Sequence, residues 1–250
     1  MTLSDALFAA ASPAEGISQS ELVVLSIKSM ITRGDLHAGS RLPIEKDLAG
    51  ALGVSRGSLR EGVRALCIMG VLETRQGDGT YVTSLDSDLL LGPMAFVVDL
   101  QAPEHRADLH AVRRVLESEA AAKAALHITD ADLAGAHESL EAARATVFAR
   151  PVTDHDAVMS ADVEFHRVVA GASGNAMLAA LINALADRTI PARRTIGVRH
   201  EEQVRRAFLE HEAILAALAA RDPDRARLLM AHHLLAIEDY VHEEDEFGAR

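Results

Sequence analysis

The chain has 250 residues, of which 49% are apolar, 25% charged and 3% aromatic, and its formal net charge is -12. This length allows two modest domains or one large one, and the apolar share is ordinary for a protein that buries a core. No apolar run approaches the ~20 residues of a membrane helix, and residues 1–19 lack the pattern of a secretory signal, which argues against membrane and secreted classes.

Three helical patterns and two strand patterns follow a small, polar segment at 1–17, which we expect to be a flexible leader. Apolar residues at helical spacing predict helices at 21–31, 45–52 and 56–69, with Ser55 as the N-cap of the third. Residues 71–75 and 80–83 favour strands, and the Gln76-Gly77-Asp78-Gly79 segment between them is typical of a hairpin. This order predicts a winged helix-turn-helix at 18–83.

The second half of the chain is helical in pattern. Residues 84–104 are interpreted as a linker, and residues 105–243 as an antiparallel bundle of five or six helices, followed by a tail at 244–250. The predicted helix breaks lie near Thr129, Arg150-Pro151, Gly171–Asn175, Ile190-Pro191 and Asp222-Pro223. The fold class is therefore predicted to be mainly α, with the winged domain first and the all-α bundle second.

The third predicted helix carries an arginine stripe suited to nucleic acid. Arg56, Arg60 and Arg64 recur every fourth residue, on the face opposite the apolar positions. Ser55 and Ser58 lie at the N-terminus of this helix, where free backbone N–H groups favour an anion. In a major groove, the arginines could reach guanine edges and the serines could reach phosphates. The alternative is that this stripe is only the solvated face of a core helix.

The acidic net charge does not contradict DNA binding, because the charge is unevenly distributed. Residues 1–85 contain 8 basic and 9 acidic residues, whereas residues 86–250 contain 17 and 28. A local basic face in the first half remains possible. The single Cys67 excludes an internal disulfide framework and predicts a reducing, cytoplasmic location.

A longer set of residues carries a family resemblance. The segments are Ile31-x-x-Gly34, Gly39-x-x-Leu42-Pro43, Leu48-Ala49-x-x-Leu52-Gly53-Val54-Ser55-Arg56, Leu59-Arg60-Glu61, Leu66-x-x-x-Gly70 and Gly77-x-Gly79-x-Tyr81-Val82. Over about 60 residues this run resembles the N-terminal domain of the GntR family of bacterial regulators. The resemblance implies contact with double-stranded DNA through Lys46, Ser55, Arg56, Ser58, Arg60, Gln76 and Gly77. Asp78 departs from it, since a neutral or basic wing tip would suit phosphates better.

A metal site is predicted in the bundle from the spacing of one aspartate and three histidines. Asp162 and His166 share one helical face. His211 lies 11 residues before Asp222 and His233 lies 11 residues after it, so a helical hairpin turning there brings the two histidines level. His232 would face elsewhere. This ligand set suits Zn²⁺, Ni²⁺, Fe²⁺ or Mn²⁺, and the alternative is that all four are ordinary polar positions.

The same part of the chain has its own family resemblance. Arg113 with Leu116-Glu117, Asp162-x-x-Phe165-His166, Ser173-Gly174-Asn175 and the His211 to His233 spacing resemble the FCD effector domain of the FadR-like subfamily, over roughly 105–240. The resemblance implies a divalent metal held by the aspartate and three histidines, a small carboxylate effector and a homodimer. We assign the effector contact to Arg113, with a salt bridge to Glu117 as the alternative. The metal set argues against an acyl-CoA effector.

The sequence is compatible with three functional classes. The leading one is a DNA-binding regulator, most simply a repressor, whose dimer binds a short inverted-repeat operator under control of an acid effector. The second is a metal-dependent hydrolase that activates water at the Asp/His₃ centre. The third is an effector-independent DNA-binding or scaffolding protein. A winged helix that binds protein instead of DNA is a further alternative for the first domain.

Overall fold

The computed structural model describes residues 16–86, 89 and 106–248, which belong to two compact units, 1–93 and 94–250. The predicted leader at 1–17 and linker at 84–104 fall almost wholly outside the described residues. None of the helices in the described ranges is both long and apolar enough to cross a membrane.

Three helices begin the first unit: α2 (Gln19–Thr32), α3 (Glu45–Leu52) and α4 (Arg56–Ile68). α2 starts with a capping box, because Ser18 accepts from the backbone of Glu21 while the Glu21 carboxylate accepts from the Ser18 backbone. α3 ends at Gly53, whose φ of 66° is the left-handed conformation that glycine adopts readily. α2 and α4 approach closely at Gly62, where an added Cβ would lie 2.7 Å from Val23.

A two-stranded antiparallel hairpin completes this unit. β1 (Leu72–Arg75) pairs with β2 (Gly79–Val82), with Leu72 opposite Val82 and Arg75 opposite Gly79. Leu72 and Val82 pack into a core with the inward faces of the three helices. The predicted winged helix-turn-helix is therefore confirmed.

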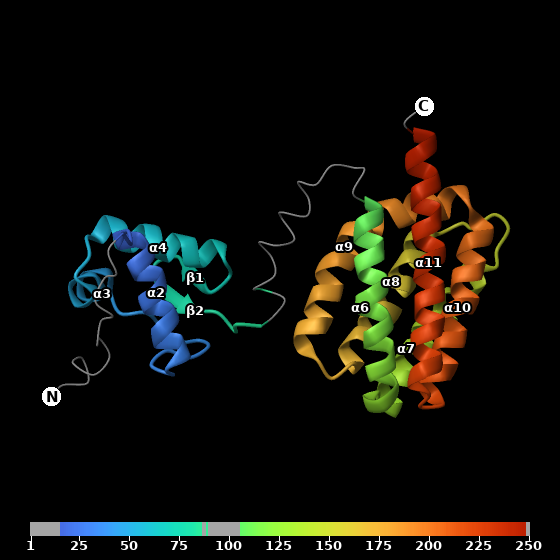
Figure 1. Cartoon of the computed structure of the whole chain (residues 1–250), viewed down its shortest axis with the longest axis horizontal. Helices are drawn as coiled ribbons and strands as arrows, with labels where there is room; N and C mark the ends of the chain where they lie inside the picture. The colour runs from blue at the N-terminus through green and yellow to red at the C-terminus, as the bar shows by residue number, and fades with distance from the viewer. Residues whose placement is uncertain (1–15, 87–88, 90–105, 249–250) are drawn as a thin grey trace. The chain divides into compact units, whose positions relative to one another are not determined.

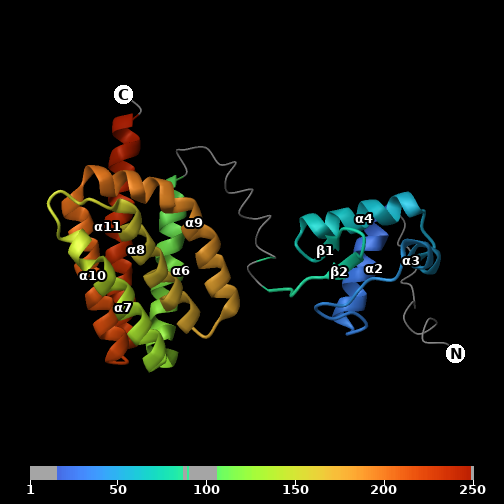
Figure 2. The ribbon, with the colours of Figure 1, turned by 180° about the vertical axis from the view of Figure 1, so that it is seen from behind.

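Six helices form the second unit within the described residues. They are α6 (Arg106–His127), α7 (Asp130–Val147), α8 (His155–Ala172), α9 (Ala176–Arg199), α10 (Glu201–Ala219) and α11 (Pro223–Gly248). α6 and α11 lie side by side in front in Figure 1, and Figure 2 shows α7, α8 and α9 from the opposite side. Small and aliphatic side chains fill the centre around Phe165 of α8, so the predicted helical bundle is confirmed.

Two predicted boundaries in the bundle differ from the structure. The expected break near Ile190-Pro191 is wrong, since α9 continues through it to Arg199. A proline inside a helix costs about 3 kcal/mol, but α9 is anchored on both sides of it: Thr189 accepts from Arg113, and Arg193 donates to Asp162. Tertiary contacts thus outweigh the local preference. α11 runs to Gly248, beyond the boundary predicted at residue 243.

Candidate nucleic-acid interface and candidate metal centre

The N-terminus of α4 is held by a small hydrogen-bond network. The Ser55 hydroxyl accepts from the backbone N–H of Ser58 at 3.0 Å, which caps the helix. Gln19 at the start of α2 accepts from the Ser55 backbone at 3.1 Å and from the Ser58 hydroxyl at 3.0 Å. Ser55 is exposed and Ser58 is half-buried. Ser55 and Ser58, both predicted to contact DNA, therefore also hold α4 against α2 through Gln19. No sequence motif pointed to this role of Gln19.

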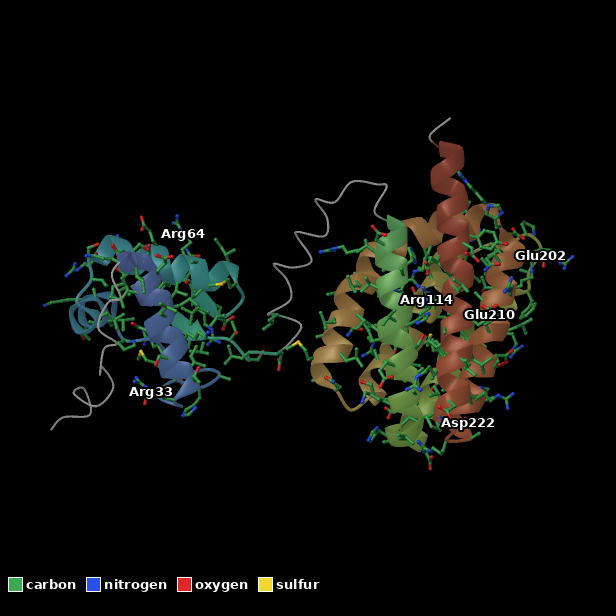
Figure 3. The ribbon with its side chains drawn as sticks, in the orientation of Figure 1. Arg33, Arg64, Arg114, Glu202, Glu210 and Asp222 are labelled. Carbon is green, nitrogen blue, oxygen red and sulfur yellow. The ribbon has the colours of Figure 1, made fainter. Side chains whose placement is uncertain are left out.

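The arginine stripe of α4 faces solvent. Arg56, Arg60 and Arg64 are all exposed, and Figure 3 shows Arg64 on the outer side of α4. Arg60 donates from Nε to both carboxylate oxygens of Glu45, at 3.0 and 2.9 Å. These two side chains are 68% and 51% exposed, so water competes for both and the pair contributes little stability. Arg60 can exchange Glu45 for a phosphate or base at small cost.

The wing tip is open, and its acidic residue has partners. Gly77 adopts a φ of 76° and has no atoms crowding its Cβ position. Asp78 accepts a 2.8 Å hydrogen bond from the Tyr81 hydroxyl, and the guanidinium of Arg41 lies 3.9 Å from its carboxylate while donating to its backbone carbonyl. Arg41 thus offsets the charge that made Asp78 a misfit. Arg41 was not among the predicted DNA contacts, although it lies inside the Gly39-x-x-Leu42 segment.

A groove of about 640 Å³ separates the wing from α3 and α4. Its charged lining residues are Arg41, Glu45, Arg60, Arg64, Arg75 and Asp78. The predicted contacts Gln76 and Gly77 line it as well, and Lys46 is exposed on α3. Four arginines against two carboxylates make this the locally basic face that the sequence left open, and such a face attracts the phosphate backbone.

Three helices of the second unit bring the four predicted metal ligands together. Asp162 and His166 come from α8, one turn apart, while His211 comes from α10 and His233 from α11. One ligand atom of each lies within 4.8 Å of the others, and the three histidines are buried. The turn before Pro223 makes α10 and α11 a hairpin, so the His211 and His233 rings lie 4.4 Å apart. His232 points outward and is 61% exposed.

The candidate ligand atoms lie close to the spacing that a shared divalent ion would impose. The Nε2 atoms of His211 and His233 are 3.1 Å apart. Two imidazoles bound to one ion at roughly 2.1 Å, at octahedral or tetrahedral angles, place these atoms about 3.0–3.4 Å apart. Oδ1 of Asp162 is 3.7 Å from Nε2 of His211 and 3.9 Å from that of His166. The donor set of one carboxylate and three imidazoles is therefore of the type that a metal such as Zn²⁺ takes, and the His211–His233 spacing lies in the range for two bound ligands, whereas the two oxygen–nitrogen distances are longer.

Two glutamates contact the Nδ1 atoms of His166 and His233, on the opposite side of each ring from the Nε2 atom that would bind a metal. Nδ1 of His166 lies 2.5 Å from the Glu117 carboxylate, and Nδ1 of His233 lies 2.9 Å from that of Glu210. A carboxylate at Nδ1 fixes the tautomer and leaves Nε2 as the metal-binding atom. Figure 3 shows Glu210 at the packed faces of α10 and α11. Nothing in the sequence pointed to Glu210, and Glu117 was predicted only as a partner of Arg113. No fixed spacing in the sequence links either glutamate to its histidine.

Electrostatics favour metal-binding protonation states at Asp162, His211 and His233. Burial raises the pKa of Asp162, but Arg193 and the three histidines outweigh it and hold this pKa well below its usual range. Arg193 donates to Oδ2, which leaves Oδ1 facing the histidines. Burial lowers the pKa of His211 and of His233. An ionised carboxylate and neutral imidazoles are metal-binding forms.

Arg113 forms the salt bridge to Glu117 that was the alternative to an effector contact. It is fully buried, its Nε donates to Glu117 at 2.7 Å, and its Nη1 donates to Thr189 at 2.7 Å. Its Nη2 atom has no partner among the described residues. Burial, together with Arg113 and Arg193, lowers the pKa of the neighbouring His110 to about 3. Arg113 thus belongs to a buried charged cluster beside the candidate metal centre.

A cavity of about 80 Å³ opens onto the other side of this centre. Asp162 and His211 contribute to its wall, and so does Arg193, whereas Arg113 does not. Glu164, which lies between the two ligands on α8, is paired with Arg167 at 2.6 Å and is no part of this wall. The cavity therefore gives a small molecule a route to the candidate metal centre.

Comparisons with known proteins identify both units. Residues 19–82 match the family described as bacterial regulatory proteins, gntR family, and residues 108–236 match the FCD domain. The chain is 30% identical over 223 residues to the HTH-type transcriptional repressor NanR of Klebsiella aerogenes, covering 87% of this chain and 83% of the relative. The Salmonella newport NanR repressor is also 30% identical, over 226 residues, covering 89% of this chain and 85% of that protein.

Solved structures give the same result. A Streptococcus agalactiae GntR structure aligns with a TM-score of 0.61 at 26% identity, covering 88% of this chain and 99% of that one. The E. coli McbR/YncC structure aligns with a TM-score of 0.50 at 22% identity, covering 91% and 99%, and supports the fold alone. The matched families and relatives are regulators rather than enzymes.

Proposed function

The chain belongs to the gntR family of bacterial regulatory proteins and carries an FCD domain, and from this premise we propose that it is an acid-responsive repressor. It is a DNA-binding transcription regulator and not an enzyme. In the proposal, a divalent metal in the bundle holds a small organic acid, and binding of that acid changes operator affinity. One observation carries the proposal: Asp162, His166, His211 and His233 converge beside a cavity.

The DNA contacts proposed for this regulator lie on α3, α4 and the wing. Lys46, Ser55, Arg56, Ser58, Arg60, Gln76 and Gly77 are the predicted set. Arg41 and Arg64 join it because they line the same groove as Arg60, Gln76 and Gly77. Arg56 and Arg60 are exposed, as base or phosphate contacts need to be. Arginine recognises guanine through two hydrogen bonds, and phosphate contacts set the position of the protein on DNA.

The metal and the acid form the sensing half. Asp162 and the three histidines would hold the ion, Glu117 and Glu210 would fix the ring orientations, and the metal would act as a Lewis acid that binds an anionic oxygen. Zn²⁺, Ni²⁺, Fe²⁺ and Mn²⁺ all tolerate this set. The acid can shift the DNA-binding equilibrium only by the difference between its affinities for the two arrangements of the protein.

We further propose a two-fold homodimer in the cytoplasm, bound to an inverted-repeat operator. Support comes from apolar side chains on the outer faces of α6 and α11, each at least 44% exposed: Val112, Val115, Leu126, Leu228 and Leu235. These two helices lie side by side (Figure 1), and a second copy that packs across both would cover these side chains.

A mobility-shift experiment with the DNA upstream of the chain's own gene tests the regulator. The wild-type protein, loaded with Zn²⁺, should form a specific complex at moderate salt, and one acid in a panel should change its affinity. His166→Ala should keep the specific complex and lose the response to acid. Arg56→Ala should weaken the specific complex, because each good arginine–base contact contributes about 1–3 kcal/mol. If no specific complex forms, with or without metal and acids, the proposal is wrong.

A further inference from the structure

Three residues at the contact between α2 and α4 share one chain of hydrogen bonds. Gln19 begins α2 and is exposed, whereas Ser55 and Ser58 lie at the start of α4. The side-chain oxygen of Gln19, Oε1, lies 3.1 Å from the backbone nitrogen of Ser55 and 3.0 Å from the Ser58 hydroxyl. The two serine hydroxyls are 2.9 Å apart. These contacts determine where each hydrogen of the cluster points.

The backbone of Ser55 fixes the orientation of the Gln19 amide. A backbone N–H only donates, so the amide atom that faces it must be the oxygen and not the nitrogen. The same oxygen accepts the single hydrogen of the Ser58 hydroxyl. The amide nitrogen Nε2, which carries two hydrogens, is therefore the atom turned away from Ser55. Within the part of the chain that the structure describes, no residue accepts a hydrogen bond from it.

The two serine hydroxyls use all of their hydrogens inside the protein. The hydrogen of Ser58 goes to Gln19, so the contact between the hydroxyls requires Ser55 to donate to Ser58. The Ser55 oxygen meanwhile accepts from the backbone of Ser58. Ser55 is exposed and can turn its hydrogen outward without losing this cap, whereas Ser58 is half-buried and would have to release Gln19. Ser58 is therefore poorly placed to donate to DNA.

We propose that Gln19 donates to the DNA backbone through Nε2, and that Ser58 is a positioning residue that holds the Gln19 amide in place. This inference rests on the proposed DNA interface and exchanges Ser58 for Gln19 in the predicted contact set. The oxygens of a DNA phosphate only accept hydrogen bonds, so an exposed amide with two free hydrogens and a fixed orientation suits them. Arg56, which follows Ser55 and is exposed, lies at the same end of α4.

The acidic residue nearest to Gln19 in the sequence is engaged elsewhere. Glu21 lies two residues further along α2, about 200° around the helix from Gln19. Its carboxylate accepts from the backbone and from the hydroxyl of Ser18, both at 2.9 Å. Gln19 therefore keeps its two amide hydrogens for an acceptor outside the protein.

Gln19→Glu in the full chain separates the two roles of this side chain. A carboxylate still accepts from Ser55 and Ser58, so the urea unfolding midpoint of the first unit should not fall. It has no hydrogen to donate and would face phosphates, so affinity for the upstream DNA fragment should fall at least tenfold in a mobility shift. Ser29→Glu is the matched control, because it places the same charge on an exposed position of α2 about 15 Å further along the helix. It should change affinity less than twofold.

A second measurement locates the contact on DNA. Gln19→Met keeps the length of the side chain and removes both its donor and its acceptor. Uncharged methylphosphonate groups replace the phosphates of the bound fragment one at a time, and affinity is measured for the wild type and for the variant. One replacement should weaken the wild type and leave Gln19→Met unaffected, because the two changes remove the same contact. A purely structural role would instead give losses that add at every phosphate.

Three results would overturn the role of Gln19 and leave the regulator in place. They are an unaltered operator affinity in Gln19→Glu, equal losses in Gln19→Glu and Ser29→Glu, and losses in Gln19→Met that add at every phosphate. A wild-type chain that forms no specific complex with the upstream fragment would overturn the proposed function as well.

Discussion

Glu117 and Glu210 lie against the Nδ1 atoms of two candidate metal ligands, on the side away from the point where the four ligand atoms meet. Each makes the ring nitrogen that faces the metal more basic and restricts rotation of the ring. Their surroundings differ, because Glu117 is buried with Arg113 while Glu210 also accepts from Arg206, which is half-exposed. Glu210 is therefore the better position for a substitution, since its loss strands no buried arginine.

Glu210→Ala should weaken metal binding about 10- to 100-fold without abolishing it, because the ligands remain and only the orientation of His233 is lost. The measurement is competition for Zn²⁺ with a chromogenic chelator. Glu164→Ala is the control, since Glu164 lies between the two ligands on α8 but pairs with Arg167 instead. Equal affinities of the two variants would contradict the role assigned to Glu210.

The stability of the second unit, measured with chelator, should fall as the pH is lowered from 7.5 to 5.5. His110, His211 and His233 have lowered pKa values in the folded chain, so between these pH values the unfolded chain binds protons that the folded chain does not. With a pKa near 6.5 in the unfolded chain, each contributes roughly 1 kcal/mol over this range.

Carboxylates do not explain a loss of stability in that window. Asp162 and Glu117 also have lowered pKa values, but their stabilisation is fully present above the unfolded pKa of about 4 and is lost only in stronger acid. Urea midpoints at several pH values check the prediction, and His110→Gln should flatten the slope. Stability that is constant or rises between pH 7.5 and 5.5 would contradict it.

At the scale of elements, α4 shows how one side chain serves both folding and recognition. Ser55 caps the helix through the backbone of Ser58 and is itself exposed toward the face proposed for DNA. The helix needs only an oxygen acceptor at this position, whereas DNA tolerates a neutral donor far better than a negative charge. The two roles can therefore be separated by substitution.

Ser55→Asp should leave the unfolding midpoint of the first unit nearly unchanged, because aspartate caps helices as well as serine does. Its operator affinity should fall at least tenfold, since a carboxylate would face phosphates. Ser55→Ala should instead destabilise the unit by about 1 kcal/mol. Urea unfolding and mobility shifts measure the two effects. An unaltered operator affinity in Ser55→Asp would remove Ser55 from the proposed DNA contacts.

At the scale of the whole molecule, the acidic charge and the basic groove belong to different units. The second unit, residues 94–250, contains 26 of the 37 acidic residues, whereas four arginines line the groove of the first unit. The acidic second unit repels the phosphate backbone, which is consistent with DNA contacts proposed for the first unit alone. The proposed homodimer would use a surface that is not strongly charged, such as the exposed apolar side chains of α6 and α11.

Val115→Glu should convert the proposed dimer to a monomer and weaken operator binding, because it places a charge on the apolar face of α6. Val115 is 64% exposed, so its replacement should not disturb the core. Sedimentation velocity measures the association state. Leu209→Glu on α10, where Leu209 is 52% exposed, is the control and should remain a dimer. A dimeric Val115→Glu protein would move the interface elsewhere.

The sequence by itself determined the elements and their order. Apolar spacing, the Ser55 cap and the glycine-rich turn at Gly77 are local signals, and they sufficed to predict three helices, a hairpin and a helical bundle. The four candidate metal ligands were also predictable. Asp162 and His166 share one helix face, and His211 and His233 are equally distant in sequence from Asp222, where the helical hairpin turns. Such features depend only on the geometry of neighbouring residues or of a single hairpin.

Only the tertiary structure decided which side chains meet across different helices. The continuity of α9 through Pro191 depends on contacts to α6 and α8, which outweigh the local preference for a break. The pairing of Glu210 with His233, of Arg193 with Asp162 and of Gln19 with Ser58 joins separate helices, and no fixed spacing encodes it. The cavity beside the candidate metal centre likewise arises from packing, because empty space is a property of the assembled bundle and not of any one segment.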